Sequence, residues 1–232
     1  MSFESVSAVV PAAGVGRRMA SDIPKQYLPL AGSTVIEQTL AKLLSIPAIN
    51  VIVVAVSADD GDWQQLPLAH HPKVKTVIGG AERAHSVLAA LEYLKSAGGA
   101  GQVLVHDAAR PCVRVADVQR LLDSCGDGGG ILAAPVSDTL KKSGVDGGIE
   151  NTVPRQNLWA AFTPQMFELH ALHQALQGAL QAGFEITDEA SAMEWAGKTP
   201  QLVEGHRDNI KITRPEDLLL ADLILSQQLT KG

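Results

Sequence analysis

Short runs of apolar, largely β-branched residues alternate with amphipathic segments along the whole chain. This order is typical of βαβ units, in which crossover helices join parallel strands. The pattern predicts strands at Ser7–Pro11, Asn50–Val56, Val74–Ile78, Gln102–His106 and Gly130–Val136, and helices at Val35–Leu44, Glu82–Ser96, Val115–Ser124, Pro164–Ala182, Asp188–Ala196 and Arg214–Gln228. We therefore expect an α/β fold with a mostly parallel twisted sheet and helices on both faces.

The alternation is interrupted between Ser137 and Thr163. A glycine-rich turn at residues 143–148 is flanked there by two polar stretches, which is typical of a β-hairpin. We predict a projecting hairpin arm at about residues 137–160. Such an arm exposes apolar groups that a second copy of the chain could cover, namely Val153, Leu158 and Trp159.

Length and composition favour a cytoplasmic protein of one domain. The chain has 232 residues, enough for one substantial core. Although 46% of the residues are hydrophobic, no apolar run approaches the roughly 18 to 20 residues that cross a bilayer. No signal-peptide pattern precedes the first predicted strand. Cys112 and Cys125 lack the spacing of a disulfide framework or a metal site, so we expect free thiols.

The formal net charge of −6 argues against a nucleic-acid partner, which would require a basic stripe or domain. It does not argue against a small anionic substrate, because local fields depend on where the charges lie. Basic residues do gather in particular loops, at Arg17, Arg18, Lys25, Arg110, Arg155, Lys211 and Arg214.

The first candidate site is the loop after the first predicted strand. Residues 9–19 read VVPAAGVGRRM, and PKQYL follows at residues 24–28. Small residues and glycines let backbone N–H groups approach a phosphate, although an ordinary tight turn between a strand and a helix has the same sequence pattern. Met19 excludes a dinucleotide fingerprint, and no Gly-Lys-Ser/Thr follows as in a Walker A loop. Arg18 and Lys25 favour a site that stabilises charge on a transferring phosphoryl group.

The second candidate is Asp107, which follows an apolar strand and so reaches the carboxyl edge of the sheet. A single carboxylate can hold Mg²⁺ when water and phosphate oxygens complete its coordination. The alternative is structural, with Asp107 capping the next helix and Arg110 in a surface ion pair. We interpret His106 as structural.

Three further segments have structural and functional interpretations. Gly79–Gly80 precede a helix and could bring backbone groups to a base or ribose, or form an ordinary loop. Thr187 or Asp188 caps one predicted helix, and Thr213 caps the last. Lys211 lies in an alternating segment that we interpret as a strand, so its side chain faces a cleft or solvent.

Taken in order, these segments resemble the 2-C-methyl-D-erythritol 4-phosphate cytidylyltransferase family of the non-mevalonate isoprenoid pathway. The resemblance runs from Ala8 to Asp217 through PAAGxGxRM, PKQY, GGxER, HDAARP, PVxDTxK, TPQ, TDEAS, VEG and DNIKxTxPEDL. It implies a Rossmann-like nucleotide-diphospho-sugar transferase fold. It also implies transfer of CMP from CTP to the polyol phosphate, release of pyrophosphate, a need for Mg²⁺ or another divalent cation, and a homodimer.

The resemblance also implies roles for single residues. Arg18 and Lys25 match residues that stabilise the transition state at the α-phosphate, and Asp107 matches the Mg²⁺ ligand. The CTP-binding positions are matched by Ala12, Ala13, Gly14, Gly80, Ala81 and Ser86. Ala81 departs from the family, which often has Asp there, so backbone contacts alone are expected.

On the acceptor side, the resemblance implies contacts to the polyol phosphate from Arg110, Thr187 and Lys211. Thr139 and Arg155 match contacts that the arm delivers into the neighbouring subunit's site, and Arg155 and Lys211 are also expected to act in catalysis. A phosphate monoester is largely dianionic at neutral pH, so no general base is required. The site has to neutralise and align two anions.

Three alternatives remain at the level of sequence. A sibling cytidylyltransferase acting on ribitol 5-phosphate would share these motifs. A catalytically silent nucleotide-binding scaffold would have no need of Arg18, Lys25 and Asp107 together. A fused bifunctional enzyme is not expected, because the chain ends shortly after Asp217.

Overall fold

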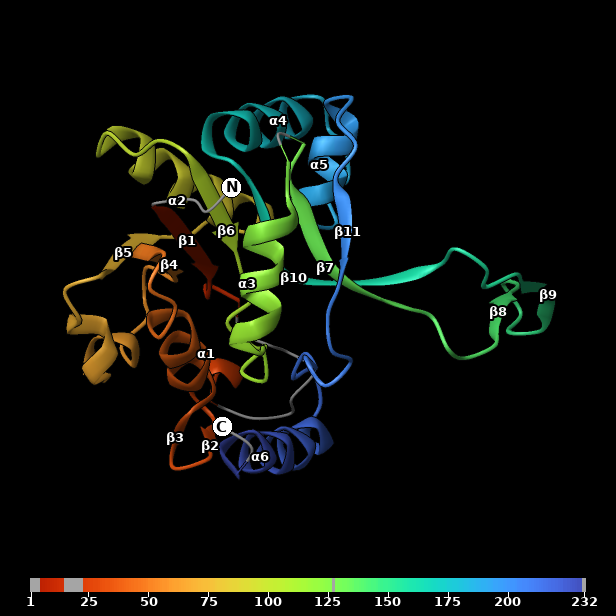
Figure 1. The fold of residues 1–232 in the computed structure, drawn as a ribbon, viewed down its shortest axis with the longest axis horizontal. Helices are drawn as coiled ribbons and strands as arrows, with labels where there is room; N and C mark the ends of the chain where they lie inside the picture. The colour runs from red at the N-terminus through yellow and green to blue at the C-terminus, as the bar shows by residue number, and fades with distance from the viewer. Residues whose placement is uncertain (1–4, 15–22, 127, 231–232) are drawn as a thin grey trace.

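The protein is described here from a computed structural model, which covers residues 5–14, 23–126 and 128–230. Its main sheet contains β1 (Val6–Pro11), β4 (Ile49–Val56), β5 (Val74–Ile78), β6 (Gln102–Val105), β7 (Gly130–Pro135), β10 (Trp159–Glu168) and β11 (Gln201–Glu204). The seven strands follow the order β11-β7-β10-β6-β1-β4-β5 (Figure 1). Every neighbouring pair is parallel except the two that involve β10. The predicted α/β fold with a mostly parallel sheet is confirmed.

Helices cover both faces of this sheet. One face packs on α1 (Val35–Leu44) and α3 (Val115–Ser124), and the other on α2 (Arg83–Ser96), α4 (Leu169–Gln181) and α5 (Glu189–Trp195). Successive residues of β1 show the division, since Val10 joins the first core and Val9 the second. A strand buried on both faces is nearly continuously apolar, which is why these strands were readable from the sequence.

A third, smaller core lies beneath α6 (Pro215–Thr230), where Leu225 packs with Leu30 and Ile212. The short elements are β2 (Pro29–Leu30), β3 (Ser33–Thr34), and the 3-10 helices η2 (Lys25–Tyr27), η3 (Trp63–Gln65) and η4 (Pro67–His70). This core lies along the chain segments that carry Lys25 and Lys211.

The structure corrects the predicted helix at Pro164–Ala182. Its first five residues belong to β10, whose Met166 and Phe167 are buried in opposite cores. The helix begins at Leu169, and the carboxylate of Glu168 caps it by accepting bonds from two backbone N–H groups. Proline is common at the start of a helix, so the sequence alone suggested the earlier start.

Two other assignments change. β11 was not predicted, because it is a four-residue edge strand with mostly exposed positions. Residues 210–212 were predicted as a strand but form none. Ile212 is buried there and donates one backbone hydrogen bond to Ala109, so alternation reflected burial rather than pairing in a sheet.

The predicted arm is a β-hairpin of β8 (Leu140–Ser143) and β9 (Ile149–Val153), which projects away from the body (Figure 1). Its exposed apolar side chains include Val145 and Ile149. The three apolar residues that we expected to be exposed are instead half-buried, namely Val153, Leu158 and Trp159. Val153 pairs with β8 and Trp159 with β7, which covers part of each side chain.

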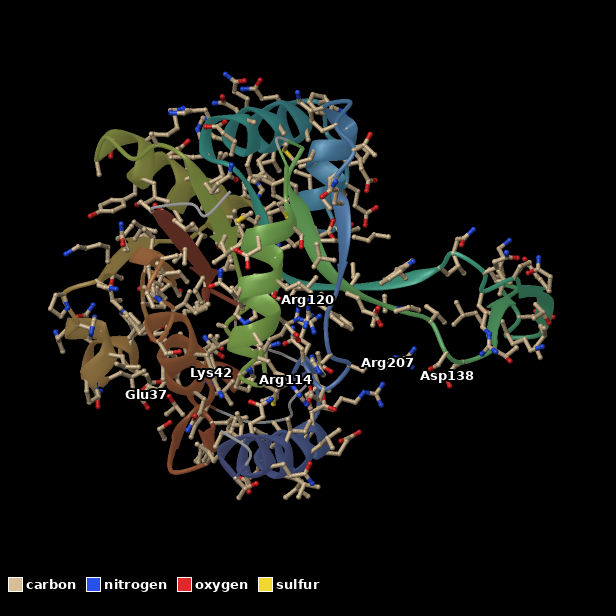
Figure 2. All side chains as sticks on the ribbon, viewed as in Figure 1. Glu37, Lys42, Arg114, Arg120, Asp138 and Arg207 are labelled. Atoms are coloured by element: carbon tan, nitrogen blue, oxygen red, sulfur yellow. The ribbon has the colours of Figure 1, made fainter. Side chains whose placement is uncertain are left out.

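The base of the arm is held to the body. Arg207 points from the segment after β11 toward this base, where Asp138 also lies (Figure 2). Its guanidinium donates hydrogen bonds to the hydroxyl of Ser137 and the carbonyl of Pro135. The body therefore sets the direction in which the arm leaves.

Within the described residues, no helix is long and apolar enough to cross a membrane. Cys112 and Cys125 are free and buried, as predicted. Burial raises the pKa of the Cys112 thiol to about 12 and that of the Cys125 thiol to about 11. Both thiols therefore stay protonated at neutral pH.

Candidate functional site

The loops after β1, β5 and β6 converge at one edge of the sheet because these strands run parallel and close together. They enclose a cleft of about 180 Å³. Its lining includes the predicted nucleotide residues Ala12, Ala13, Gly14, Gly80, Ala81 and Ser86, together with Lys25, Asp107 and Lys211. The structure thus brings together most of the residues that the sequence indicated.

The loop between β5 and α2 is tightly packed against this cleft. A Cβ on Gly79 would lie 2.7 Å from Ser86 Oγ and 2.8 Å from Ala13 Cβ, and one on Gly80 would lie 2.3 Å from His85 Cβ. Ser86 Oγ accepts a hydrogen bond of 3.1 Å from the N–H of Gly80. A side chain at either position would collide with these neighbours and force them to move, which explains the glycines.

A second cavity, of about 300 Å³, lies beside the first. It is lined by Arg110 and Thr187, both predicted to contact the polyol phosphate. The two cavities share Arg83, Asp107 and Lys211. These three side chains therefore form a common wall where ligands in the two cavities would meet.

Asp107 is the centre of this wall. Its Oδ1 lies 2.9 Å from Arg83 Nε, and its Oδ2 lies 2.8 Å from Lys211 Nζ and 3.5 Å from Arg110 Nε. Burial alone would raise the pKa of Asp107, but Arg83, Lys211 and Arg110 hold it well below its usual value. The carboxylate is ionised and stabilised by the three cations.

The structural alternatives for this motif are wrong. The next helix, α3, is preceded by Arg114 at its cap position, so Asp107 does not cap it. Arg110 is largely buried rather than on the surface. It donates a hydrogen bond of 2.7 Å to the carbonyl of Asn209 and lies 5.4 Å from the centre of the Phe162 ring.

His106 is structural, as interpreted from the sequence. It is fully buried between two partners, with Nε2 at 3.1 Å from the carbonyl of Arg110 and Nδ1 at 3.1 Å from Thr163 Oγ1. Thr163 Oγ1 accepts from the N–H of Asp107, so its hydroxyl donates to Nδ1, and Nε2 carries the proton. Burial lowers the pKa of His106 to about 4, which fits this neutral ring.

Sequence reasoning missed Arg83 and Glu189. Arg83 donates to both oxygens of Glu189, at 2.6 and 3.0 Å, while its Nε holds Asp107. Burial lowers the pKa of Arg83, but the two carboxylates outweigh it and raise the pKa above its usual value. One signal was available, because Arg83 is the first residue of α2. The helix dipole disfavours a cation at that position.

Lys25 lines the first cavity from η2. Its Nζ donates to the carbonyl of Ile212 at 3.1 Å. The neighbouring Gln26 donates to the carbonyl of Ala12 at 2.9 Å, and Tyr27 donates to Asp60 at 2.6 Å. The Gln26 bond fixes η2 against the end of β1, and the other two tie η2 to the segment of Lys211 and to the loop after β4. Arg18, the other predicted cation of this loop, lies outside the described residues.

The segment that carries Lys211 is held by α3 rather than by a sheet. Arg114 pairs with Asp208, and Asp117 accepts from the backbone N–H of His206 at 2.9 Å. Arg120 donates to the carbonyl of Glu204. Arg114 and Arg120 lie near this segment in Figure 2. Lys211 lines both cavities, so of the two expected orientations, toward a cleft or toward solvent, the structure shows the first, although the predicted strand does not form.

Thr139 and Arg155 lie on the arm and are exposed. Neither belongs to the lining of the two cavities. A single chain thus leaves them apart from the other predicted residues, and their delivery to a neighbouring subunit stays a prediction.

The fit of a metal ion depends on Asp107. Among the described residues, no three His, Cys, Asp or Glu side chains are grouped to hold a metal. Asp107 supplies one carboxylate at the cavity wall, already paired with three cations. A carboxylate can supply one ligand of a Mg²⁺ ion that takes its other ligands from phosphate and water, but the ion would have to share Asp107 with these cations or displace one of them.

The mostly parallel sheet, with two cation-lined cavities meeting at its carboxyl edge, agrees with the class of α/β nucleotidyltransferases, whose solved members it resembles. Comparison with known families then specifies the group. Residues 6–227 match the family described as IspD: 2-C-methyl-D-erythritol 4-phosphate cytidylyltransferase. The chain belongs to this family, and the resemblance seen in its motifs is confirmed.

Individual relatives agree with this assignment. A Vibrio atlanticus protein named 2-C-methyl-D-erythritol 4-phosphate cytidylyltransferase is 55% identical over 227 residues, covering 97% of each chain. One of the same name from Shewanella oneidensis is 55% identical over 223 residues, covering 95% of this chain and 88% of the relative. The solved Francisella tularensis enzyme of that name is 35% identical, with a TM-score of 0.83, covering 95% of this chain and 99% of its own.

Proposed function

We propose that this chain transfers CMP from CTP to 2-C-methyl-D-erythritol 4-phosphate, giving 4-diphosphocytidyl-2-C-methyl-D-erythritol and pyrophosphate in isoprenoid precursor biosynthesis. Membership of the family supports the activity. The observation that carries the mechanism is the wall shared by the two cavities, where Lys211 and Asp107 lie 2.8 Å apart. A nucleotide in the first cavity and a phosphate monoester in the second would meet there.

The reaction is a substitution at the α-phosphorus of CTP. A monoester oxygen attacks it and forms a new P–O bond, while the bond to the oxygen bridging the α- and β-phosphorus breaks. Pyrophosphate leaves with that electron pair. The monoester is already ionised, so the site contributes alignment and positive charge rather than a base.

The residues divide between the two ligands. In the first cavity, backbone groups of the loops after β1 and β5 hold the nucleotide, and Ala81 contributes no side-chain contact. Lys25 stabilises charge at the α-phosphate, together with Arg18. In the second cavity, Arg110, Thr187 and Lys211 hold the polyol phosphate. Bound Mg²⁺ would neutralise charge on the triphosphate, with Asp107 as its protein ligand.

The active unit proposed here is a homodimer in the cytoplasm, where CTP is available. The exposed apolar side chains of the arm, including Val145 and Ile149, support a partner, because water-exposed apolar groups of this kind favour association. In the dimer, Thr139 and Arg155 enter the partner's site. Sedimentation at catalytic concentrations should show a dimer, and a fully active monomer would refute this part.

The activity is tested by measuring pyrophosphate release with Mg²⁺, CTP and 2-C-methyl-D-erythritol 4-phosphate. Ribitol 5-phosphate replaces the acceptor in one comparison, and ATP, GTP or UTP replaces CTP in others. Release confined to CTP and the methylerythritol phosphate is expected. A preference for ribitol 5-phosphate would change the acceptor, and no release with any pair would overturn the proposal.

A further inference from the structure

Glu189 is a fully buried carboxylate that no step of the proposed reaction uses directly. Both of its oxygens accept from Arg83, at 2.6 and 3.0 Å. Arg83 in turn donates from Nε to Asp107 at 2.9 Å, and Asp107 holds Lys211 at 2.8 Å. An unbroken series of charged contacts therefore runs from the interior to the wall between the cavities.

Stability gives little reason for this arrangement. A buried ion pair is on average no more stabilising than apolar residues of similar volume, because desolvation offsets the attraction. The N-terminus of α5 already has a capping box, formed by Asp188 and Ser191. At the start of α2 the helix dipole disfavours Arg83. The pair therefore calls for an explanation outside folding.

The position of Arg83 supplies that explanation. It lines both cavities, and its bonds to Glu189 and Asp107 use three of the five guanidinium N–H groups. The two-point contact with Glu189 fixes the plane of the guanidinium. The remaining N–H groups can then meet phosphate oxygens, and Nε keeps Asp107 oriented toward Lys211.

We infer that Glu189 is a positioning residue for cytidylyl transfer, acting through Arg83 on the Asp107–Lys211 wall. This inference rests on the proposed function and assigns a further residue to its site. Glu189 touches no substrate. It sets the position of the cationic groups that would receive the two phosphates.

The test is Glu189→Gln, assayed by pyrophosphate release well below the variant's unfolding temperature. Misplacing a catalytic group by about 1 Å can lower turnover by about 10²-fold, so we expect kcat to fall by that order. KM should change much less. Glu194→Gln is the matched control, because Glu194 is an exposed glutamate on the same helix. A kcat within about threefold of wild type in folded Glu189→Gln would overturn the inference.

A double-mutant cycle separates positioning from simple stabilisation. If Glu189 acts through Arg83, adding Glu189→Gln to Arg83→Gln should lower kcat by less than about threefold more. This double variant also leaves no unpaired buried charge. Independent losses that multiply would instead show that Glu189 does not act through Arg83.

If Glu189→Gln does not fold, Glu189→Asp serves in its place, because it keeps the charge and shortens the reach by one methylene. We expect kcat at least about tenfold below wild type, since the two-point contact is lost. Wild-type turnover in folded Glu189→Asp would refute the inference. Inactivity of the wild-type protein would instead refute the proposed function, so the two failures are distinguishable.

Discussion

A methyl group added to Gly79 perturbs the nucleotide cleft while leaving its charges in place. In Gly79→Ala, the new Cβ would lie 2.7 Å from Ser86 Oγ and 2.8 Å from Ala13 Cβ. Ordinary contacts of this kind are about 3.5 Å or longer. Ser86 and Ala13 must therefore retreat by about 0.7 Å, and both line the first cavity.

The expected cost follows from that displacement. Overpacking of this size destabilises a protein by about 1–3 kcal/mol. For a chain of this length, that lowers the unfolding midpoint by about 2–12 °C. Because the displaced residues line only the first cavity, KM for CTP should rise by about 10- to 100-fold. KM for the polyol phosphate should stay close to that of wild type.

Thermal unfolding followed by circular dichroism and steady-state pyrophosphate release measure the two effects. Gly61→Ala is the control, because no described atom lies within 4 Å of the added Cβ. An unfolding midpoint within 1 °C of wild type, together with an unchanged KM for CTP, would refute this reasoning. It would show that the loop accommodates the methyl group without displacing the residues that line the cleft. Equal changes in both KM values would refute the separation of the two cavities.

Three further predictions concern the cations, the arm and the last helix. Lys25→Ala and Arg18→Ala should each lower kcat by a few powers of ten with little loss of stability, and near-normal turnover in either variant would refute the assignment. Mixing inactive Lys25→Ala with inactive Arg155→Ala should restore about a quarter of wild-type activity. Half of the random dimers would be mixed, and each of these would hold one intact site, with Lys25 from one subunit and Arg155 from the other. No recovery after subunit exchange would place Arg155 outside the partner's site. Asp217 accepts from the N–H groups of Thr213 and Arg214, at 2.8 and 2.9 Å, and despite some burial these bonds lower its pKa. A lowered pKa in the folded state stabilises the fold above the unfolded value of 3.8, and the gain is lost as pH falls below it. Asp217→Asn should therefore cost about 1 kcal/mol at pH 7 and progressively less in acid, as urea unfolding at several pH values would show; a gap that does not depend on pH would contradict the reasoning.

Local patterns determined much of the fold. The apolar runs of β1, β4 and β6 are buried on both faces, so their sequences already indicated strands of a parallel sheet. The same order placed Asp107 at the carboxyl edge, where the structure has it. Pro164 was misleading, because a proline that begins a helix and one inside a strand look alike without knowledge of the pairing partner.

The sequence by itself thus determined the alternation of strands and helices, the projecting hairpin and the motifs at the sheet edge. Burial produces a local periodic pattern of apolar residues, and turns require particular residue types such as glycine. Only the tertiary structure decided that β10 runs against its neighbours, that α3 holds the segment of Lys211, and that Arg83 meets Glu189. Arg83 and Glu189 are 106 positions apart in the chain. Their contact depends on the order of strands in the sheet and on the packing of α2 and α5 against α4, and neither follows from a local periodic pattern.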